Sequence, residues 1–344
     1  MEKIRLGRTG LMVTRVGFGA LPLQRVDRAE AARILCRAYD AGINFYDTAR
    51  GYTDSEEKIG DALSGVRDRI VIATKSAAKS REGVLQDLEK SLRNLKTDYV
   101  DLLQLHNPRA MPDPEDPGSS YAGLLEAREK GMVRFIGFTN HSRERALQAV
   151  ESGLFDTLQF PFSAISSMEE LALIGHCQQA DVGVIAMKPL CGGLLTEARP
   201  AFAFLWQFEN VVPIWGIQRM EELEESLALA SDPPVLDAAL RAEIERDRQE
   251  LAGDFCRGCG YCQPCPEEIP IPMAARMSLL LRRSPYQPLL TEEWAERMMR
   301  IEKCRECGEC MSRCPYGLEI PRLLQEMLAD YKAFRERHMP LPAE

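Results

Sequence analysis

Short apolar runs alternate with amphipathic stretches from residue 12 to about residue 232. The apolar runs are rich in β-branched and aromatic residues, a composition that predicts strands. Eight such runs are present: Val16–Gly19, Asn44–Asp47, Ile70–Lys75, Val100–His106, Phe135–Phe138, Thr157–Phe160, Val184–Met187 and Val211–Ile214.

The stretches between these runs predict helices with recognisable ends. Asp27 is the expected N-cap of a helix that ends at Gly42, and Ser142 is the expected N-cap of one that ends at Gly153. The other helices are expected near 55–64, 80–95, 121–131, 168–180, 199–209 and 219–230. Eight alternating strand and helix units predict an α/β fold, a closed (β/α)8 TIM barrel rather than an open sheet.

Two segments add detail to the predicted barrel. Lys3–Leu6 and Leu11–Thr14, joined by a glycine-rich turn, predict a hairpin that closes the bottom of the barrel. The stretch from Asn107 to Ser120 contains four prolines and directly follows a strand, which predicts a long loop. Such a loop belongs either to a barrel site or to a surface excursion without function.

The β pattern disappears after residue 235. Helices are expected at 236–251, 273–283, 291–303 and 322–337. The sequence therefore predicts a barrel domain over residues 1–234 and an α-helical domain over residues 235–344.

Charge and hydropathy narrow the function classes. The 344 residues include 43 Lys and Arg against 52 Asp and Glu, a net charge of -9 that disfavours nucleic-acid binding. The chain begins with charged residues and contains no apolar run of the roughly 20 residues that a membrane span needs. We therefore expect a cytoplasmic protein without a membrane span.

Polar residues follow three successive strands of the predicted barrel. Asp47 ends the second strand with Tyr52 just beyond it, Lys75 ends the third, and His106 ends the fourth. A phenol has a free pKa of about 10, and a nearby ammonium favours its ionised form. Lys75 would thus ease proton release from Tyr52, Asp47 would orient Lys75, and His106 would donate to a carbonyl oxygen. Each residue taken alone is also compatible with a structural role.

The barrel region, roughly residues 3–230, resembles the aldo-keto reductase family. The motifs that carry the resemblance are Gly7-Arg-Thr-Gly10, Tyr46-Asp-Thr-Ala-Arg-Gly-Tyr52 with Ser55-Glu-Glu57 and Gly60, Ala73-Thr-Lys75, Leu103-Gln-Leu-His106 and Gly137-Phe-Thr-Asn140. The resemblance implies that Asp47, Tyr52, Lys75 and His106 form a catalytic tetrad. It also implies carbonyl reduction with hydride from a nicotinamide cofactor, or the reverse alcohol oxidation.

The same resemblance implies the cofactor contacts. Asn140 and Gln159 match the residues that bind the carboxamide, and Lys188 is a candidate for the pyrophosphate. The adenosine end maps onto Gly216, Arg219 and Glu225, but Glu222 falls where the family often has a phosphate-binding arginine. NADPH and NADH therefore both remain candidates.

Eight of the eleven cysteines fall in two dense motifs. They are Cys256-Arg-Gly-Cys259-Gly-Tyr-Cys262-Gln-Pro-Cys265 and Cys304-Arg-Glu-Cys307-Gly-Glu-Cys310-Met-Ser-Arg-Cys314, each followed by proline. In bacterial dicluster ferredoxins the last cysteine of each motif binds the other cluster. The spacing predicts two [4Fe-4S] clusters, one on Cys256, Cys259, Cys262 and Cys314 and the other on Cys304, Cys307, Cys310 and Cys265. Zinc held by paired cysteines is the alternative.

The three remaining cysteines lie in the barrel region. Cys36 and Cys177 are expected in the core, and Cys191 is expected either at the site or in packing. Taken together, the two halves resemble the iron-sulfur branch of the aldo-keto reductases.

Three functions fit this combination. The first is a carbonyl reductase whose clusters relay electrons to or from a ferredoxin-like or flavoprotein partner. The second is the same reductase with purely structural clusters. The third is a non-catalytic redox sensor or electron-transfer adaptor. Each cluster takes one electron whereas hydride carries two, and the sequence has no flavin fingerprint.

Overall fold

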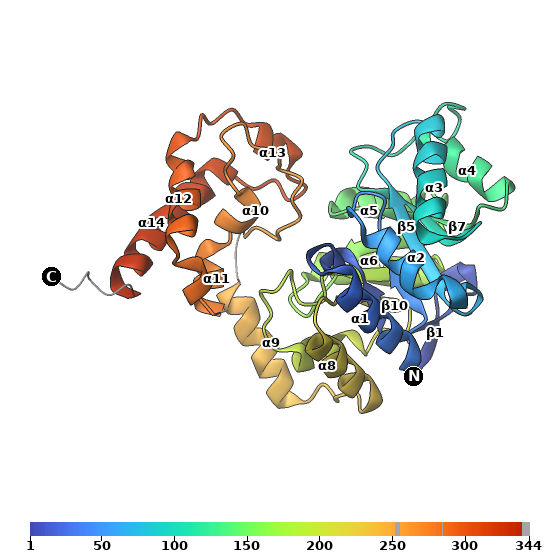
Figure 1. Cartoon of the computed structure of the whole chain (residues 1–344), viewed down its shortest axis with the longest axis horizontal. Coiled ribbons are helices and arrows are strands. Elements are labelled where there is room, and N and C mark those ends of the chain that lie inside the picture. Colours follow the sequence, from blue (N-terminus) through green and yellow to red (C-terminus); the bar gives the residue numbers. More distant parts are fainter. Residues whose placement is uncertain (252–254, 284, 339–344) are drawn as a thin grey trace. The chain divides into compact units, whose positions relative to one another are not determined.

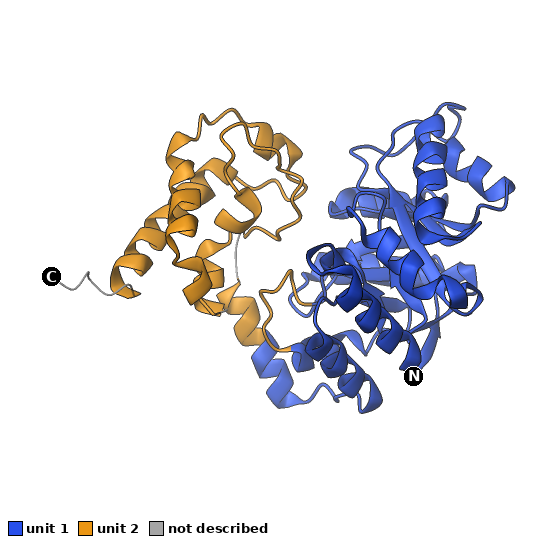
Figure 2. Cartoon of the chain, viewed as in Figure 1, with its two compact units in different colours: residues 1–189, 198–244 blue, residues 190–197, 245–344 orange. Residues whose placement is uncertain are grey.

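A computed structural model describes residues 1–251, 255–283 and 285–338 of the chain. These residues divide into two compact units. The first unit comprises residues 1–189 and 198–244, and the second comprises residues 190–197 and 245–344 (Figure 2). The division falls inside a helix near residue 244, and the short segment 190–197 is grouped with the cysteine region.

The first unit is a closed barrel of eight parallel strands, as the apolar pattern predicts. Neighbouring strands follow the chain order, and the last strand pairs with the first to close the barrel. The strands are β3 (Gly17–Gly19), β4 (Phe45–Asp47), β5 (Val71–Ser76), β6 (Val100–His106), β7 (Val133–Thr139), β8 (Thr157–Pro161), β9 (Gly183–Met187) and β10 (Val211–Gly216).

Helices alternate with these strands along the chain (Figure 1). They are α1 (Arg28–Asp40), α2 (Ser55–Leu63), α3 (Arg81–Leu95), α4 (Ser120–Glu129), α5 (Arg143–Glu151), α6 (Met168–Gln179), α7 (Ala198–Leu205) and α8 (Met220–Ser231). The Asp27 side chain accepts a hydrogen bond from Glu30 N, and the Ser142 side chain accepts one from Arg145 N. Both predicted N-caps are therefore confirmed.

A hairpin closes one end of the barrel, as predicted. It consists of β1 (Lys3–Arg5) and β2 (Met12–Thr14), which pair antiparallel. Its apolar side chains share a buried cluster with residues at the amino ends of the strands, among them Phe45, Val71 and Val212. The turn between its strands approaches β9 closely, because a Cβ atom on Gly7 would lie 2.1 Å from Gly183 N. The polar residues Asp47, Lys75 and His106 lie at the opposite end of the barrel, where the strands finish.

The described residues of the second unit form helices and 3-10 turns without a strand. The helices from residue 238 onward are α9 (Ala238–Glu250), α10 (Ile271–Ala274), α11 (Met277–Arg283), α12 (Glu292–Met299), α13 (Glu309–Arg313) and α14 (Ile320–His338). A core of buried apolar side chains, including Met277, Met298 and Leu324, joins α10, α11, α12 and α14 and packs against several of the cysteines. None of the helices that the structure describes is both long and apolar enough to cross a membrane.

Two sequence predictions need correction, and one short helix was missed. The helix expected over 273–283 is broken after Ala274, and Arg276 lies at the break with its Nε donating to Pro272 O (2.9 Å). The short helix α13 inside the second cysteine motif was not predicted. Cys36 is exposed rather than in the core, because the buried face of α1 consists of Ala31, Ile34, Leu35 and Ala38. Cys177 is buried as expected.

Candidate functional site

The carboxyl ends of β4 and β5 place a buried ion pair at the open end of the barrel. Lys75 Nζ lies 2.6 Å from Asp47 Oδ1 and also donates to Thr48 O at 2.6 Å. The side chains of Lys75 and Asp47 are 1% and 2% exposed. Burial raises the pKa of Asp47 and lowers the pKa of Lys75, and the attraction between the opposite charges opposes both shifts.

Tyr52 is positioned by the loop that follows β4. Backbone bonds from Thr48 N to Ala73 O (2.8 Å) and from Arg50 N to Lys75 O (3.0 Å) hold this loop along the end of β5. The half-buried Tyr52 ring therefore lies beside the ammonium, with Lys75 Nζ 5.3 Å from the ring centroid. This arrangement brings a phenol next to a fixed cation.

His106 completes the group from the end of β6. Its ring meets the Tyr52 ring edge to face, with centroids 5.8 Å apart and an interplanar angle of 80°. Burial, reinforced by the nearby Lys75 ammonium, lowers the pKa of His106 to about 3. The imidazole is therefore neutral at physiological pH and suited to donate a hydrogen bond rather than a charge. The structure thus brings together all four residues of the expected tetrad.

The two residues expected to bind the cofactor carboxamide, Gln159 and Asn140, both have hydrogen-bond partners in the protein. Gln159 Nε2 donates to Asp47 Oδ1 (3.3 Å), and its Oε1 accepts from Gln104 Nε2 (2.7 Å). Gln104 also reaches Asp47 Oδ2 at 3.4 Å. Asn140 is fully buried and donates to Pro108 O (2.9 Å) at the start of the proline-rich loop. Both expected contacts are therefore engaged with protein groups in this structure.

Gln104 is a site residue that the sequence analysis missed. Its position gives a signal, because Gln104 precedes His106 by two residues and so shares its face of the strand. A buried polar residue needs a partner, and the partners of Gln104 are Asp47 and Gln159.

The start of α8 carries the expected adenosine contacts. Glu222 Oε2 accepts from Gln218 N (2.9 Å) and Arg219 N (3.2 Å). Its Oε1 accepts from Arg219 Nε at 2.9 Å. The carboxylate thus occupies two backbone donors and the arginine directly before this helix. Gly216 and Glu225 are exposed nearby in the chain, and Lys188 is partly buried just after β9.

The cysteines of the second unit form two groups that each mix the two motifs. One group comprises Cys256, Cys259, Cys262 and Cys314. Burial raises the pKa of Cys262 to about 12, and the thiolates of Cys256, Cys259 and Cys314 add to that rise. Cys256 and Cys314 also pack against the buried cluster that contains Cys262, which places these two motifs side by side.

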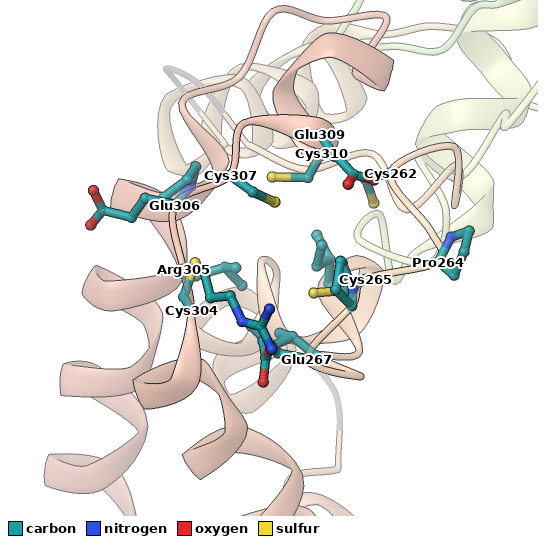
Figure 3. A pocket seen from close by; sticks show the side chains of 15 residues that line it. Cys262, Pro264, Cys265, Glu267, Cys304, Arg305, Glu306, Cys307, Glu309 and Cys310 are labelled. Atoms are coloured by element: carbon teal, nitrogen blue, oxygen red, sulfur yellow. The ribbon is translucent and has the colours of Figure 1, made fainter.

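The other group surrounds a cavity of about 160 Å³. Its lining includes Cys265 from the first motif together with Cys304, Cys307 and Cys310 from the second, and Cys262 also reaches it. Figure 3 shows the sulfur atoms of Cys265, Cys307 and Cys310 directed toward this shared space. Within the described residues no three Cys, His or carboxylate side chains converge as the ligands of a single metal ion do. A cavity lined by these thiols has the donor set and the room that a cubane cluster requires.

Comparison with known proteins identifies both halves of the chain. The Aldo/keto reductase family model matches residues 15–201, which is more than half of the chain. This chain belongs to the aldo/keto reductase family. The 4Fe-4S dicluster domain model matches residues 255–318, which contain both cysteine motifs.

Individual relatives agree with this assignment. L-galactose dehydrogenase of Arabidopsis thaliana is 33% identical over 219 residues, covering 58% of this chain and 69% of that protein. NADH-specific methylglyoxal reductase of Escherichia coli (strain K12) is 27% identical, covering 57% of this chain and 69% of that protein. An aldo-keto reductase from Bacillus halodurans, solved in its holo form, has the same fold with a TM-score of 0.64 and 23% identity. That likeness covers 72% of this chain and 96% of the other.

The chain is therefore an oxidoreductase of the aldo/keto reductase family that carries a 4Fe-4S dicluster domain. Membership in the family implies a nicotinamide cofactor, and the second domain implies iron-sulfur chemistry. The barrel fold, the family and the iron-sulfur domain predicted from the sequence are confirmed.

The low pKa of His106 predicts a pH-dependent stability. Between pH 6.5 and pH 3 the unfolded chain binds a proton at this histidine whereas the folded chain does not, so acid favours unfolding. From pH 7 to pH 5 the unfolding free energy of the wild type should fall relative to His106→Gln by up to roughly 2 kcal/mol. Urea unfolding followed by the fluorescence of Trp206 and Trp215 measures this difference. A difference that stays constant with pH would contradict a His106 that is neutral in the folded protein.

Proposed function

We propose that this protein reduces carbonyl compounds with NADH, or oxidises the corresponding alcohols, at Asp47, Tyr52, Lys75 and His106. The observation that carries the proposal is the buried Asp47–Lys75 pair beside the Tyr52 ring at the open end of the barrel. Few structural roles explain a buried lysine at this position, because an isolated ion pair in the interior gains little stability over apolar packing.

Each residue of the tetrad has a role that follows from its surroundings. Tyr52 gives its phenolic proton to the carbonyl oxygen of the substrate as negative charge develops there. Lys75 stabilises the phenolate that remains, and Asp47 with Thr48 O fixes the ammonium in place. His106 stays neutral and donates a hydrogen bond to the same carbonyl oxygen. A bound nicotinamide supplies the hydride.

Cofactor binding engages side chains that already have partners. Asn140 would exchange Pro108 O for the carboxamide, and Gln159 would exchange one of its contacts with Asp47 or Gln104. Lys188 is our candidate for the pyrophosphate, with Gly216, Arg219 and Glu225 at the adenosine end.

Glu222 supports NADH rather than NADPH as the cofactor. Its carboxylate already accepts two backbone N–H groups and the Arg219 guanidinium at the start of α8. A 2'-phosphate brought to this helix end would meet a like charge and find its donors in use. The relative from Escherichia coli whose name gives it as NADH-specific is consistent with this choice.

Replacing Glu222 tests the cofactor proposal. Glu222→Gln should raise kcat/KM for NADPH by about tenfold, equivalent to about 1.4 kcal/mol, and leave NADH within a factor of three. Glu221→Gln removes the same charge from an exposed neighbouring position and should change neither value. Steady-state kinetics with methylglyoxal as the test aldehyde provide the measurement. A wild type that already prefers NADPH, or equal effects of the two variants, would overturn the proposal.

We further propose that the two cysteine groups each hold one [4Fe-4S] cluster with crossed ligands. Thiolates are the donors that such clusters need, and the grouping of Cys314 with the first motif and Cys265 with the second supports crossing. Each cluster passes one electron at a time to or from a ferredoxin-like or flavoprotein partner. The alternative hypothesis is that the same cysteines hold clusters with a purely structural role.

A cytoplasmic location fits this chemistry. None of the eleven cysteines is joined in a disulfide bond, and eight of them are our proposed cluster ligands. Thiols in this number persist in reducing compartments. We therefore propose that the protein works in the cytoplasm on small carbonyl compounds.

A further inference from the structure

A short segment that follows β9 in the sequence belongs to the cysteine unit. Residues 190–197 follow β9 and the candidate contact Lys188 directly in sequence, yet they belong to the second compact unit (Figure 2). Segments that follow the strands of such barrels commonly build the reaction site. Contacts with residues of the second unit hold this segment near the proposed clusters.

One of these contacts comes from the buried, positively charged side chain of Arg276. Only 8% of the residue is exposed. Its Nη1 donates to Gly192 O at 2.9 Å, and its Nε donates to Pro272 O at 2.9 Å. The break between α10 and α11 thus places a guanidinium directly against the 190–197 segment.

The same guanidinium lies against the first cysteine motif. Gly258 stands between Cys256 and Cys259, and a Cβ atom on it would lie 2.8 Å from Arg276 Cζ. The N–H of Gly258 donates to Cys256 Sγ at 3.3 Å. A single glycine therefore contacts both the arginine and a sulfur atom of the proposed cluster, and its φ of +63° suits glycine best.

Thiolates that hold a cluster are negatively charged, and only Gly258 separates the Arg276 guanidinium from the Cys256 sulfur. Reduction adds one electron and no proton to the cluster, so its negative charge rises by one while Arg276 stays protonated. A neighbouring positive charge favours the more negative state and so raises the reduction potential.

We propose that Arg276 raises the reduction potential of the cluster held by Cys256, Cys259, Cys262 and Cys314 and fastens the 190–197 segment to that cluster. This inference rests on the proposed function only in assuming that those cysteines hold a [4Fe-4S] cluster. Arg276 is a positioning residue, and the two effects are linked. Because the reduced cluster attracts the guanidinium more strongly, the segment is held more firmly after reduction.

The test is an anaerobic redox titration of the full chain with dithionite as the electron donor, followed by electron paramagnetic resonance. Arg276→Gln should shift the midpoint of one cluster to a more negative potential and leave the other unchanged. Arg276→Lys keeps the charge and should restore most of that midpoint. In both variants the amides of residues 190–197 should exchange hydrogen several-fold faster.

Arg283 provides a matched control. Its Nε donates to Leu194 O at 2.7 Å in the same segment, but its guanidinium pairs with Asp247 and Glu250. Arg283→Gln should therefore loosen the segment without moving either midpoint. A shift as large as that of Arg276→Gln would overturn the special role of Arg276.

Wild-type protein gives a second readout if Arg276→Gln fails to retain its iron. The amides of residues 190–197 should exchange several-fold more slowly in the reduced protein than in the oxidised protein. Unchanged midpoints in Arg276→Gln, or equal exchange in the two oxidation states, would overturn the inference while leaving the clusters in place. Wild-type protein without iron would instead refute the proposed clusters themselves.

Discussion

Tyr52→Phe should lower kcat for carbonyl reduction by about 10²- to 10⁴-fold, the usual contribution of a positioned general acid. The substitution removes only the phenolic oxygen, so the ring should still meet His106 and Lys75. KM for NADH should change little, because the lost interaction belongs to the transition state. Steady-state kinetics with NADH and an aldehyde measure both values.

Tyr99→Phe is the matched control for this substitution. Tyr99 directly precedes β6 at the end of the strand opposite His106, and its ring lies 4.1 Å from Arg67 Cζ. The variant should keep its turnover within a factor of two. Turnover by Tyr52→Phe at a similar level would mean that another group protonates the substrate.

The second large effect concerns iron content. Wild-type protein purified without oxygen should contain about eight iron atoms per chain, four in each cluster. With crossed ligands, Cys256 and Cys314 serve one cluster, so the double variant Cys256→Ala, Cys314→Ala should retain about four. Cys256 and Cys265 serve different clusters, so Cys256→Ala, Cys265→Ala should lose nearly all of its iron. Chemical iron and sulfide analysis gives the counts.

Ligation within each motif predicts the reverse order of these two double variants. That reverse order would refute the crossed arrangement, although the clusters themselves would remain. Cys36→Ala replaces an exposed thiol outside both motifs and should keep the full iron content.

Local patterns predicted most of the barrel. The eight strands and the caps at Asp27 and Ser142 follow from short-range rules, because each signal lies within one element. The error at Cys36 was avoidable, since the buried positions of α1 recur at intervals of three and four residues and position 36 lies outside that stripe.

Long-range contacts explain the features that the sequence did not predict. The break before Arg276 coincides with a contact to Gly192, which is 84 residues away in the chain. Likewise, the bond from Asn140 to Pro108 joins residues 32 positions apart. Side-chain periodicity within one element carries no information about such partners. The grouping of Asp47, Tyr52, Lys75 and His106 could be predicted from the sequence because successive strand ends meet at one end of a barrel.

The central claim is that one chain joins a hydride-transfer site to two redox-active clusters. The most direct measurement is an anaerobic titration of the full protein with NADH, followed by the visible absorption of the clusters. One NADH gives up two electrons and one proton, and a flavoprotein partner can take up the hydride and pass the electrons on singly. With a catalytic amount of such a partner present, we expect one NADH to bleach both clusters by one electron each. Bleaching by dithionite but not by NADH, with or without a carbonyl substrate, would contradict the account and leave the clusters a structural role.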